Sequence, residues 1–423
     1  MSLIEEPAFA AFVGLDWGDR CHVYVLEEAA TGRRQSGTIA HTPEAVGAWV
    51  TTLQQRFGSG PIAVCLEQSR GALLSMLIGY DRLVIYPVAC TMAARLREAF
   101  FPSGAKDDRP DAELLLDVLR QHRDRLRRLE PDSEEIRTLQ FLVEERRKLV
   151  DEKTRQKNRL TAKLKLYFPQ VLQWFDDIDT ELVEAFLRRW PTLQAVQGAR
   201  AATLQRFFAQ HHSHSQARNR QRLEAMAQAQ PATRDGAVLT AATASLPLLL
   251  DLLRVLRQGI AQLEKQIAEL AAAQQDFALF RSLPGAGAAL APRLLAAFGS
   301  RRERFDSAQQ LQSYSGIAPV VERSGKRQRT RYRWACPKFL RQSFHEFAAF
   351  SIHRSLWARA YYEQLRARGK SHHQAVRSLA FKWIRILFRC WQSRTPYDEA
   401  RYLAGLARRG SSLVAALPAV HAA

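Results

Sequence analysis

The sequence predicts an α/β N-terminal domain, a long helical coiled-coil middle and a mainly α-helical C-terminal domain. Short apolar runs of β character alternate with helical patterns over residues 8–125. Dense charges on long helical repeats mark residues 126–280, and a Gly- and Pro-punctuated helical segment occupies residues 281–400. A tail at residues 401–423 is expected to be poorly ordered. A chain of 423 residues should hold two or three such domains.

The first domain is expected to begin with a β-hairpin, because AFVGLDWG and CHVYVLEE are rich in β-forming residues and a polar turn separates them. A third strand is expected near residues 35–41. Helical spacing of apolar residues predicts a helix over residues 43–57 and another over residues 71–80. The runs PIAVCLE and RLVIYPV predict buried strands. Strands followed by helix–strand alternation indicate a mixed sheet covered by helices.

Two long helical runs define the middle region. The first begins near Asp132, and the second spans residues 246–279 with leucine and isoleucine at helical intervals. They predict a coiled coil or an extended helical hairpin, paired either antiparallel within one chain or across a dimer. Between them lies HHSHSQARNRQR, whose histidines could bind a metal, although its composition favours a solvated linker.

The charge balance indicates a polyanionic partner. The chain has 62 lysine and arginine residues against 42 aspartate and glutamate residues, a formal net charge of +20. Arginine pairs with phosphate at two points, so nucleic acid is the favoured partner. A basic proteome or a membrane-surface protein would also explain the excess, and charge does not distinguish DNA from RNA.

Cysteine usage and hydropathy indicate a protein of a reducing cytoplasm. The five cysteines are far apart and form no CxxC pair, which disfavours zinc ligation and a disulfide framework. The N-terminus lacks the basic start and apolar core of a signal peptide. The most apolar stretch, residues 236–250, is shorter than the ~20 residues that span a bilayer, so no membrane partner is expected.

Four carboxylates stand at predicted strand and helix ends. Asp16 ends the first strand, Glu67 ends a later strand, and Asp108 and Asp111 share one face of a helix start. Taken singly, each acid is more often a helix cap or a surface charge. Together they can converge on one edge of a sheet, where they would repel unless a cation neutralised them. Such oxygen ligands suit Mg²⁺ or Mn²⁺.

The C-terminal domain begins with LPGAGAALAPRLLAAFG, whose turn and helix resemble a helix-hairpin-helix that presents backbone N–H groups to DNA phosphate. A basic stretch follows Ser324, and Tyr332 and Trp334 alternate with its arginines. This interleaving suits a nucleic-acid strand, and an amphipathic strand with Trp334 in the core explains the aromatics equally well. The expected nucleic-acid contacts are Lys326, Arg327, Arg329, Arg331, Arg333 and Lys338.

The motifs GLDWGD, CLEQSRG and KDDRPDAELL resemble the DEDD motifs of the IS110 family of insertion-sequence transposases. The resemblance implies an RNase H/RuvC-like first domain with Asp16, Glu67, Asp108 and Asp111 as catalytic metal ligands. The chain departs from the family where Asp107 replaces the usual Thr or Ser. Either Asp107 or Asp108 is therefore the third ligand, and the Asp-x-x-Asp spacing favours Asp108.

Residues 283–348 resemble the second conserved domain of that family through LPGAG, the YSGIAP segment and the SG pair. The resemblance implies that Ser324 is the catalytic nucleophile that becomes covalently joined to DNA. RWACPKFLRQ departs from the commonest K-x-G-N form, so the phosphate contacts are not carried over. The family also implies an element-encoded bridge RNA as partner, and the helical runs suit a homodimer or homotetramer.

These observations together predict a DNA transposase or recombinase of an insertion sequence. A metal-dependent nuclease of the junction-resolvase type, which uses the carboxylates without a nucleophilic serine, is the main alternative. A non-enzymatic nucleic-acid-binding scaffold is the second alternative.

Overall fold

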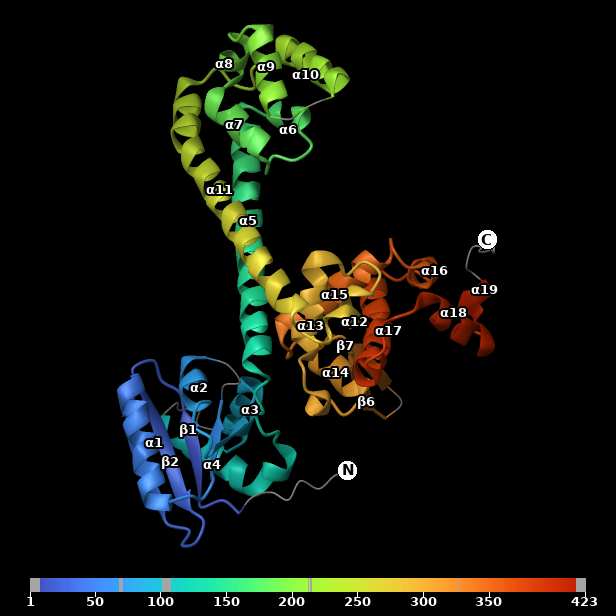
Figure 1. Cartoon of the computed structure of the whole chain (residues 1–423). Coiled ribbons are helices and arrows are strands. Elements are labelled where there is room, and N and C mark those ends of the chain that lie inside the picture. The colour runs from blue at the N-terminus through green and yellow to red at the C-terminus, as the bar shows by residue number, and fades with distance from the viewer. Residues whose placement is uncertain are drawn as a thin grey trace. The chain divides into compact units, whose positions relative to one another are not determined.

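A computed structural model describes residues 8–67, 71–100, 108–211, 213, 215–325 and 327–415. The chain separates into two compact units, Met1–Pro131 and Asp132–Ala423. Figure 1 shows a small sheet with its helices in the first unit, and a long helix pair with two helical clusters in the second. Mixed α/β structure in the first unit and mainly helical structure in the second confirm the predicted fold class at this level.

The first unit is built on a five-stranded sheet with the order β3-β2-β1-β4-β5. Strands β1, β2 and β3 are antiparallel neighbours, whereas β4 and β5 run parallel to β1. This mixed sheet was predicted, including its opening hairpin. The strands are β1 (Ala11–Asp16), β2 (Cys21–Glu28), β3 (Arg34–Ala40), β4 (Ile62–Leu66) and β5 (Leu83–Pro87).

Helices cover both faces of this sheet. One face packs on α1 and α2, and the other packs on α4. Side chains alternate along β1, so Val13 and Leu15 face α1 and α2 while Phe12 faces α4. The helical segments are α1 (Pro43–Phe57), α2 (Ala72–Leu77), α3 (Cys90–Phe100), α4 (Asp108–His122) and the 3₁₀ turn η1 (Arg123–Arg125).

Two long helices form the stem of the second unit, α5 (Glu134–Tyr167) and α11 (Gly236–Ala272). They pack antiparallel, since Arg146 of α5 donates to Glu264 near one end and Lys163 donates to Ser245 near the other. Figure 1 shows the two ribbons running side by side. The pairing within one chain was one of the two predicted alternatives, and a supercoiled coiled coil stays a prediction.

Five short helices form a cap at one end of the stem (Figure 1). The histidine-rich segment belongs to this cap, because the His211 ring lies 4.4 Å from that of Phe207 and Arg222 donates to the Trp174 carbonyl at 2.8 Å. The segment is therefore part of a folded cap rather than a linker, and its described side chains other than His211, Ser213, Asn219 and Arg222 are exposed. His212 and His214 lie outside the described residues. The cap helices are α6 (Val171–Trp174), α7 (Glu181–Arg189), α8 (Leu193–Gln197), α9 (Ala201–Gln210) and α10 (Gln216–Gln228).

By length and composition, α11 could cross a membrane, with a mean hydropathy of 1.7 over its most apolar window. The sequence-based expectation considered only residues 236–250, whereas the helix continues to Ala272. Leu246, Leu249 and Leu253 are buried in the core that the helix shares with the cap. Leu248, Leu252 and Val255 of the same helix are exposed, so packing within the second unit covers only part of its apolar surface.

The remaining helices form a core around Phe298, Phe344 and Trp383, to which both stem helices also contribute. Part of the expected tail is folded, since Leu406 and Leu413 are buried there; residues 416–423 lie outside the described residues. The elements are α12 (Phe277–Arg281), α13 (Gly287–Phe298), η2 (Arg302–Arg304), α14 (Ala308–Tyr314), β6 (Val320–Ser324), β7 (Arg327–Arg331), α15 (Lys338–Ser351), α16 (Leu356–Ala367), α17 (His372–Ser393), α18 (Glu399–Arg408) and α19 (Ser412–Ala415).

Candidate functional site

Asp16 and Glu67 lie at the same edge of the sheet. Asp16 is the last residue of β1, and Glu67 directly follows β4, which runs parallel to β1 with Leu15 opposite Leu66. The next residue pair is therefore Asp16 and Glu67. Because side chains alternate along a strand, both carboxylates share the face on which α4 packs.

Helix α4 brings Asp108 and Asp111 to that edge. The helix packs directly on the backbone of β1 at Gly14, where an added Cβ would overlap the Ala112 carbonyl oxygen and the Leu116 amide nitrogen. Only glycine permits this approach. Asp111, which precedes Ala112, is consequently held beside Asp16, and its side chain is only 4% exposed.

The electrostatics of Asp16 show that the four acids converge. Burial raises the pKa of Asp16 to about 6, and the negative charges of Asp111, Asp108 and Glu67 act in the same direction. Asp16 is itself only 9% exposed. Water therefore screens the charges of Asp16 and Asp111 poorly, whereas Glu67 is half-buried and Asp108 is exposed.

Arg97 of α3 is a member of this cluster that sequence reasoning missed. Its Nε donates to Asp111 Oδ1, and its positive charge opposes the rise in the pKa of Asp16. The hydrogen bond to Asp111 raises the pKa of Arg97 in turn. Arg97 stands in RLREAF, which belongs to no motif, and only the packing of α3 brings it to the acids.

The donor set suits a hard divalent cation. Asp111 Oδ2 is buried and has no hydrogen-bond partner in the described part of the chain, which leaves an oxygen available to a cation. Arg97 supplies positive charge to this cluster through its ion pair with Asp111. Among the described residues no group of three or more His, Cys, Asp or Glu side chains is arranged to hold a metal ion as it stands. Asp107 lies outside the described residues.

Ser324 occupies a different kind of environment. It ends β6 at the turn of an exposed two-stranded hairpin, next to Gly325, whose φ of 55° is the left-handed conformation that favours glycine. Ser324 pairs with Arg327 across the hairpin. Directly opposed residues share a face, so Arg327, Arg329 and Arg331 lie on the same face as Ser324.

The arginines of this face are exposed. Of the three, Arg331 pairs with Glu322 at 3.0 Å, and no ion pair of Arg327 or Arg329 occurs among the described residues. Arg333 donates instead to the Ala318 carbonyl, which anchors the end of the hairpin. Lys326, also expected to contact nucleic acid, lies outside the described residues.

The aromatic residues after β7 are at the surface. Trp334 is 78% exposed, which excludes the alternative that places it in the core. Its ring lies 4.6 Å from that of Tyr332. Arg341 and Arg377 lie over the Tyr332 ring at 4.8 and 4.2 Å from its centroid. Cations and aromatic rings therefore alternate in space as well as in sequence.

The glycines of the two C-terminal motifs serve packing. Gly285 has a φ of 86° and lies against the backbone of Phe350 at the end of α15. Gly316 of the YSGIAP segment has a φ of 72°, and an added Cβ would overlap Cys336. These contacts explain both glycines without a ligand. The helix-hairpin-helix contact with DNA stays a prediction.

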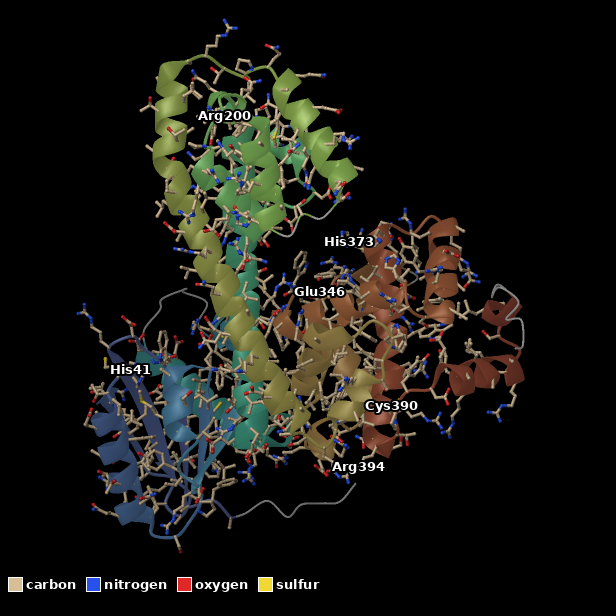
Figure 2. The ribbon with its side chains drawn as sticks, turned by 45° about the horizontal axis from the view of Figure 1, so that its top comes forward. His41, Arg200, Glu346, His373, Cys390 and Arg394 are labelled. Carbon is tan, nitrogen blue, oxygen red and sulfur yellow. The ribbon has the colours of Figure 1, made fainter. Side chains whose placement is uncertain are left out.

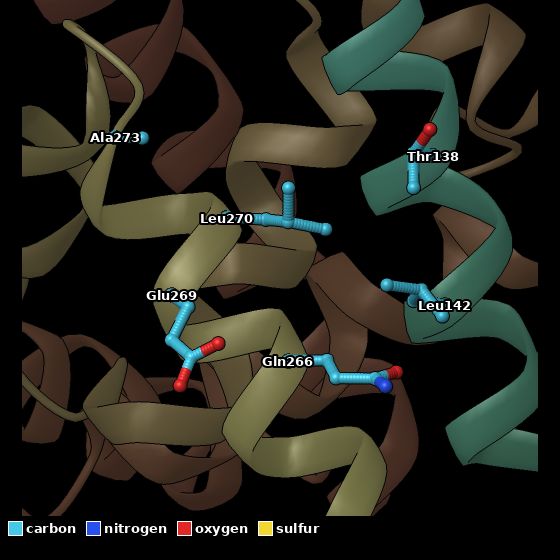
Figure 3. Close-up of a pocket in the computed structure, with 6 residues that line it drawn as sticks. All are labelled: Thr138, Leu142, Gln266, Glu269, Leu270 and Ala273. Carbon is cyan, nitrogen blue, oxygen red and sulfur yellow. The ribbon is translucent and has the colours of Figure 1, made fainter.

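Two hollows occur in the second unit. The first, of about 460 Å³, lies between the stem helices and is lined mainly by apolar groups such as Leu142 and Leu270 (Figure 3). It has no cluster of reactive side chains. The second, of about 440 Å³, is polar and contains Glu346 and His373, which are labelled in Figure 2.

Comparison with known proteins identifies both motif regions. A transposase model of the IS110 DEDD type matches residues 13–169. A second model, described as the transposase IS116/IS110/IS902 family, matches residues 277–363. The first match contains the acidic sheet edge, and the second contains the serine hairpin.

Similar proteins align over nearly their full length. The "mini-circle putative transposase for IS117" of Streptomyces coelicolor is 28% identical over 95% of this chain and 98% of its own. An IS110 insertion-element protein from the same species is 28% identical over 96% of this chain and 99% of its own. An IS116 protein of Streptomyces clavuligerus is 25% identical over 92% and 96%. Two matched domain models and these full-length relatives place the chain in the IS110 family of insertion-sequence transposases, enzymes that act on DNA.

Proposed function

We propose that this transposase cuts and rejoins DNA through a phosphoserine link at Ser324, with Asp16, Glu67, Asp108 and Asp111 forming a Mg²⁺- or Mn²⁺-dependent RuvC-like site. The observation that carries the proposal is the convergence of four acids on one sheet edge, where burial, together with the charges of the other three, raises the pKa of Asp16 to about 6. A carboxylate whose pKa is strongly raised beside other acids is typical of a functional site, which makes such a site the leading interpretation.

The serine step balances without an external energy source. Ser324 Oγ attacks a phosphodiester phosphorus, an O–P bond forms, and the bond to one DNA oxygen breaks. The Oγ proton passes to solvent, and the departing oxygen leaves as a hydroxyl. A hydroxyl of another DNA end then attacks the phosphoserine and releases Ser324. Arg327 and Arg329, on the same face as Ser324, stabilise the charge that develops on the phosphate oxygens.

The acidic edge would bind the cation and help to position the DNA strand. Asp16, Glu67 and Asp111 would hold a divalent ion, and Asp108 would complete the set. When bound, the ion supplies charge neutralisation for phosphoryl transfer. Arg97 would then exchange Asp111 for another anion, such as a DNA phosphate. The cation thereby becomes linked to the recruitment of the strand.

A bridge RNA and a homodimer or homotetramer complete the proposal, and both rest on the family resemblance. The net charge of +20 suits a protein that binds two nucleic acids. The antiparallel stem formed by α5 and α11 offers a long surface for assembly of protomers. Size-exclusion chromatography with light scattering tests the assembly, and sequencing of RNA that copurifies with the protein tests the guide.

The metal-dependent nuclease without a serine nucleophile is the competing function. The exposed position of Ser324, with no hydrogen-bonded base among the described residues, favours this alternative. The two functions differ in one product, a covalent protein–DNA adduct. They also differ in the effect of removing Ser324 on strand cleavage.

A denaturing gel of the protein with end-labelled element DNA separates the two. Wild-type protein and the control Thr330→Ala, which removes an exposed hydroxyl from the other face of the hairpin, should both give a labelled adduct. Ser324→Ala should give none. Cleavage that persists in Ser324→Ala without an adduct in the wild type would establish the nuclease.

The acidic site is tested by Asp16→Asn against Asp19→Asn, a neighbouring exposed acid. Recombination should be lost in Asp16→Asn and kept in Asp19→Asn. Mg²⁺ should raise the thermal unfolding midpoint of the wild type and leave that of Asp16→Asn unchanged, because a ligand that binds the folded state stabilises it. Equal Mg²⁺ responses in both variants would contradict the site.

A further inference from the structure

The polar hollow in the second unit lies between the start of α15 and the start of α17, and it begins where β7 ends. It measures about 440 Å³ and is lined by Tyr332, Lys338, Arg341, Gln342, His345, Glu346, His373 and Arg377. Figure 2 labels Glu346 and His373, which the two helices contribute. Apart from Lys338, these residues were not among the predicted nucleic-acid contacts.

The hollow carries an unbalanced positive charge. Lys338, Arg341 and Arg377 all line it, and none of them pairs with a carboxylate within the described part of the chain. Its one acid, Glu346, is already bound by Arg147 at 3.0 Å and by Arg293. Arg341 also donates to the Arg333 carbonyl at 3.2 Å, and Arg341 and Arg377 lie over the Tyr332 ring. These contacts leave guanidinium N–H groups that can bind an anion.

Two aromatic residues lie beside these cations. Tyr332 lies beneath Arg341 and Arg377, and Trp334 follows it at the surface with most of its ring exposed. An exposed ring beside a cationic hollow is the combination that binds a nucleic-acid strand, since bases stack on the ring while cations hold the backbone.

Neutral hydrogen-bonding groups line the floor. Burial, together with the charges of His373 and Arg377, lowers the pKa of His345, which favours the neutral form of this imidazole. Gln342 adds an amide that can donate or accept. The hollow thus offers both charge and directional hydrogen bonds to an oxygen-rich group.

We propose that this hollow binds one backbone phosphate of the DNA strand on which Ser324 acts, with Trp334 stacking on an adjacent base. The proposal rests on the function assigned to Ser324 above. Tyr332 lies five residues beyond Arg327, the partner of Ser324, so the hollow is ~17 Å along the hairpin. At 3.4 Å per nucleotide, that distance corresponds to about five nucleotides from the attacked bond.

DNA is favoured over RNA as the occupant because the hollow is continuous with the hairpin that presents Ser324. The chain runs from β7 directly into Tyr332 and on to α15, which contributes Lys338 and Arg341 to the hollow. A strand held at one end of the hairpin is thereby aligned with the serine at the other end. RNA binding is left as an outcome of the experiment.

The test measures binding of labelled 30-base-pair DNA of arbitrary sequence by the full-length protein over a range of salt concentrations. The double variant Lys338→Gln/Arg377→Gln should bind more weakly, and the slope of log K against log salt should fall by about 1 to 2. The matched double variant Arg401→Gln/Arg408→Gln removes two exposed charges from α18 and should bind as the wild type does.

Several outcomes decide the matter. Equal DNA binding by the two double variants overturns the proposal, as does a loss confined to a 30-base-pair RNA duplex run in parallel. Both variants should unfold at the wild-type temperature, which excludes misfolding. Phosphate-ethylation interference on element DNA should show, for the wild type, a signal about five nucleotides from the cut. This signal should be absent for Lys338→Gln/Arg377→Gln. The DNA-binding measurement does not need the serine hydroxyl and can be repeated in Ser324→Ala protein. Failure of the serine mechanism is therefore distinguished from failure of phosphate binding in the hollow.

Discussion

The acidic sheet edge and the serine hairpin hold their candidate functional groups in opposite environments, one packed in the fold and one exposed to solvent. The edge is built from buried elements, with α4 lying directly on Gly14 and Asp111 held by Arg97. The described hairpin residues are exposed apart from the half-buried Val320, and Ser324 is held by its pairing with Arg327. One site concentrates negative charge at the edge of a folded core, and the other presents positive charge to solvent.

This difference separates what the protein alone provides from what its substrate must provide. The acids are positioned before any ligand binds, and the proposed cation would relieve their repulsion. Ser324 has no neighbouring base among the described residues, so the proposed attack by its hydroxyl would require a group that the bound complex supplies. Substitutions should therefore affect folding at the edge and nucleic-acid interaction at the hairpin.

The largest effect is expected for Gly14→Ala. A Cβ at this position would overlap the backbone of α4, so the helix must move, at a cost of about 3 kcal/mol in the free energy of unfolding. Gly79→Ala, where nothing lies within 4 Å of the added Cβ, is the matched control. Urea unfolding combined with hydrogen exchange in β1 and α4 measures both, and equal values for the two variants would show that the close approach is unimportant.

Trp334→Ala should reduce single-stranded DNA affinity by about 1 to 3 kcal/mol, the usual contribution of a base-stacking aromatic. Its exposure means that the unfolding temperature should not change. Phe141→Ala removes another exposed aromatic from the second unit and should leave affinity unaltered. Fluorescence anisotropy with a labelled oligonucleotide distinguishes the two, and equal affinities would remove Trp334 from the interface.

Gly325→Ala should cost about 1 kcal/mol locally, because a side chain disfavours the left-handed conformation even in open space. The hairpin contributes no buried apolar cluster, so global unfolding should be unchanged while hydrogen exchange in β6 and β7 becomes faster. A lowered global midpoint would mean that the hairpin is coupled to the core.

The stability of the acidic edge should also depend on pH. The folded state binds a proton at Asp16 more tightly than the unfolded state, since the pKa rises from 3.8 to about 6. The contribution of Asp16 to stability should therefore decline as pH rises from about 4 to about 6 and stay constant above that range. Asp108→Asn removes one source of repulsion and should reduce the decline, whereas Asp19→Asn should not. Unfolding midpoints between pH 4 and 7 provide the check, and identical pH profiles for all three proteins would contradict the cluster.

Much of the first unit could be predicted from the sequence, because alternating and helical apolar patterns fix β1, β2 and α1 to within a few residues. The positions of Asp16 and Glu67 at strand ends followed from the same patterns. Arg97 could not be found, since its role depends on how α3 packs against α4. The exposure of Trp334 was also undecided, because an alternating strand has the same sequence pattern whether one face is buried or free.

The C-terminal hollow was hidden for a related reason. His345 and Arg377 lie on separate helices, and only the packing of α15 on α17 brings them to one place. Ser324 was singled out by family resemblance rather than by physical chemistry, since a single serine carries no pattern of its own. The structure adds its neighbours on the hairpin face, which is information that residue spacing alone did not provide.

The most direct measurement is mass spectrometry of the protein–DNA adduct. Wild-type protein is reacted with element DNA, the DNA is digested to nucleotides, and the peptides are sequenced. The account predicts one nucleotide linked through phosphate to Ser324, with Ser313 and Ser315 unmodified. A nucleotide on another residue, or strand exchange without any linked peptide, would contradict the account.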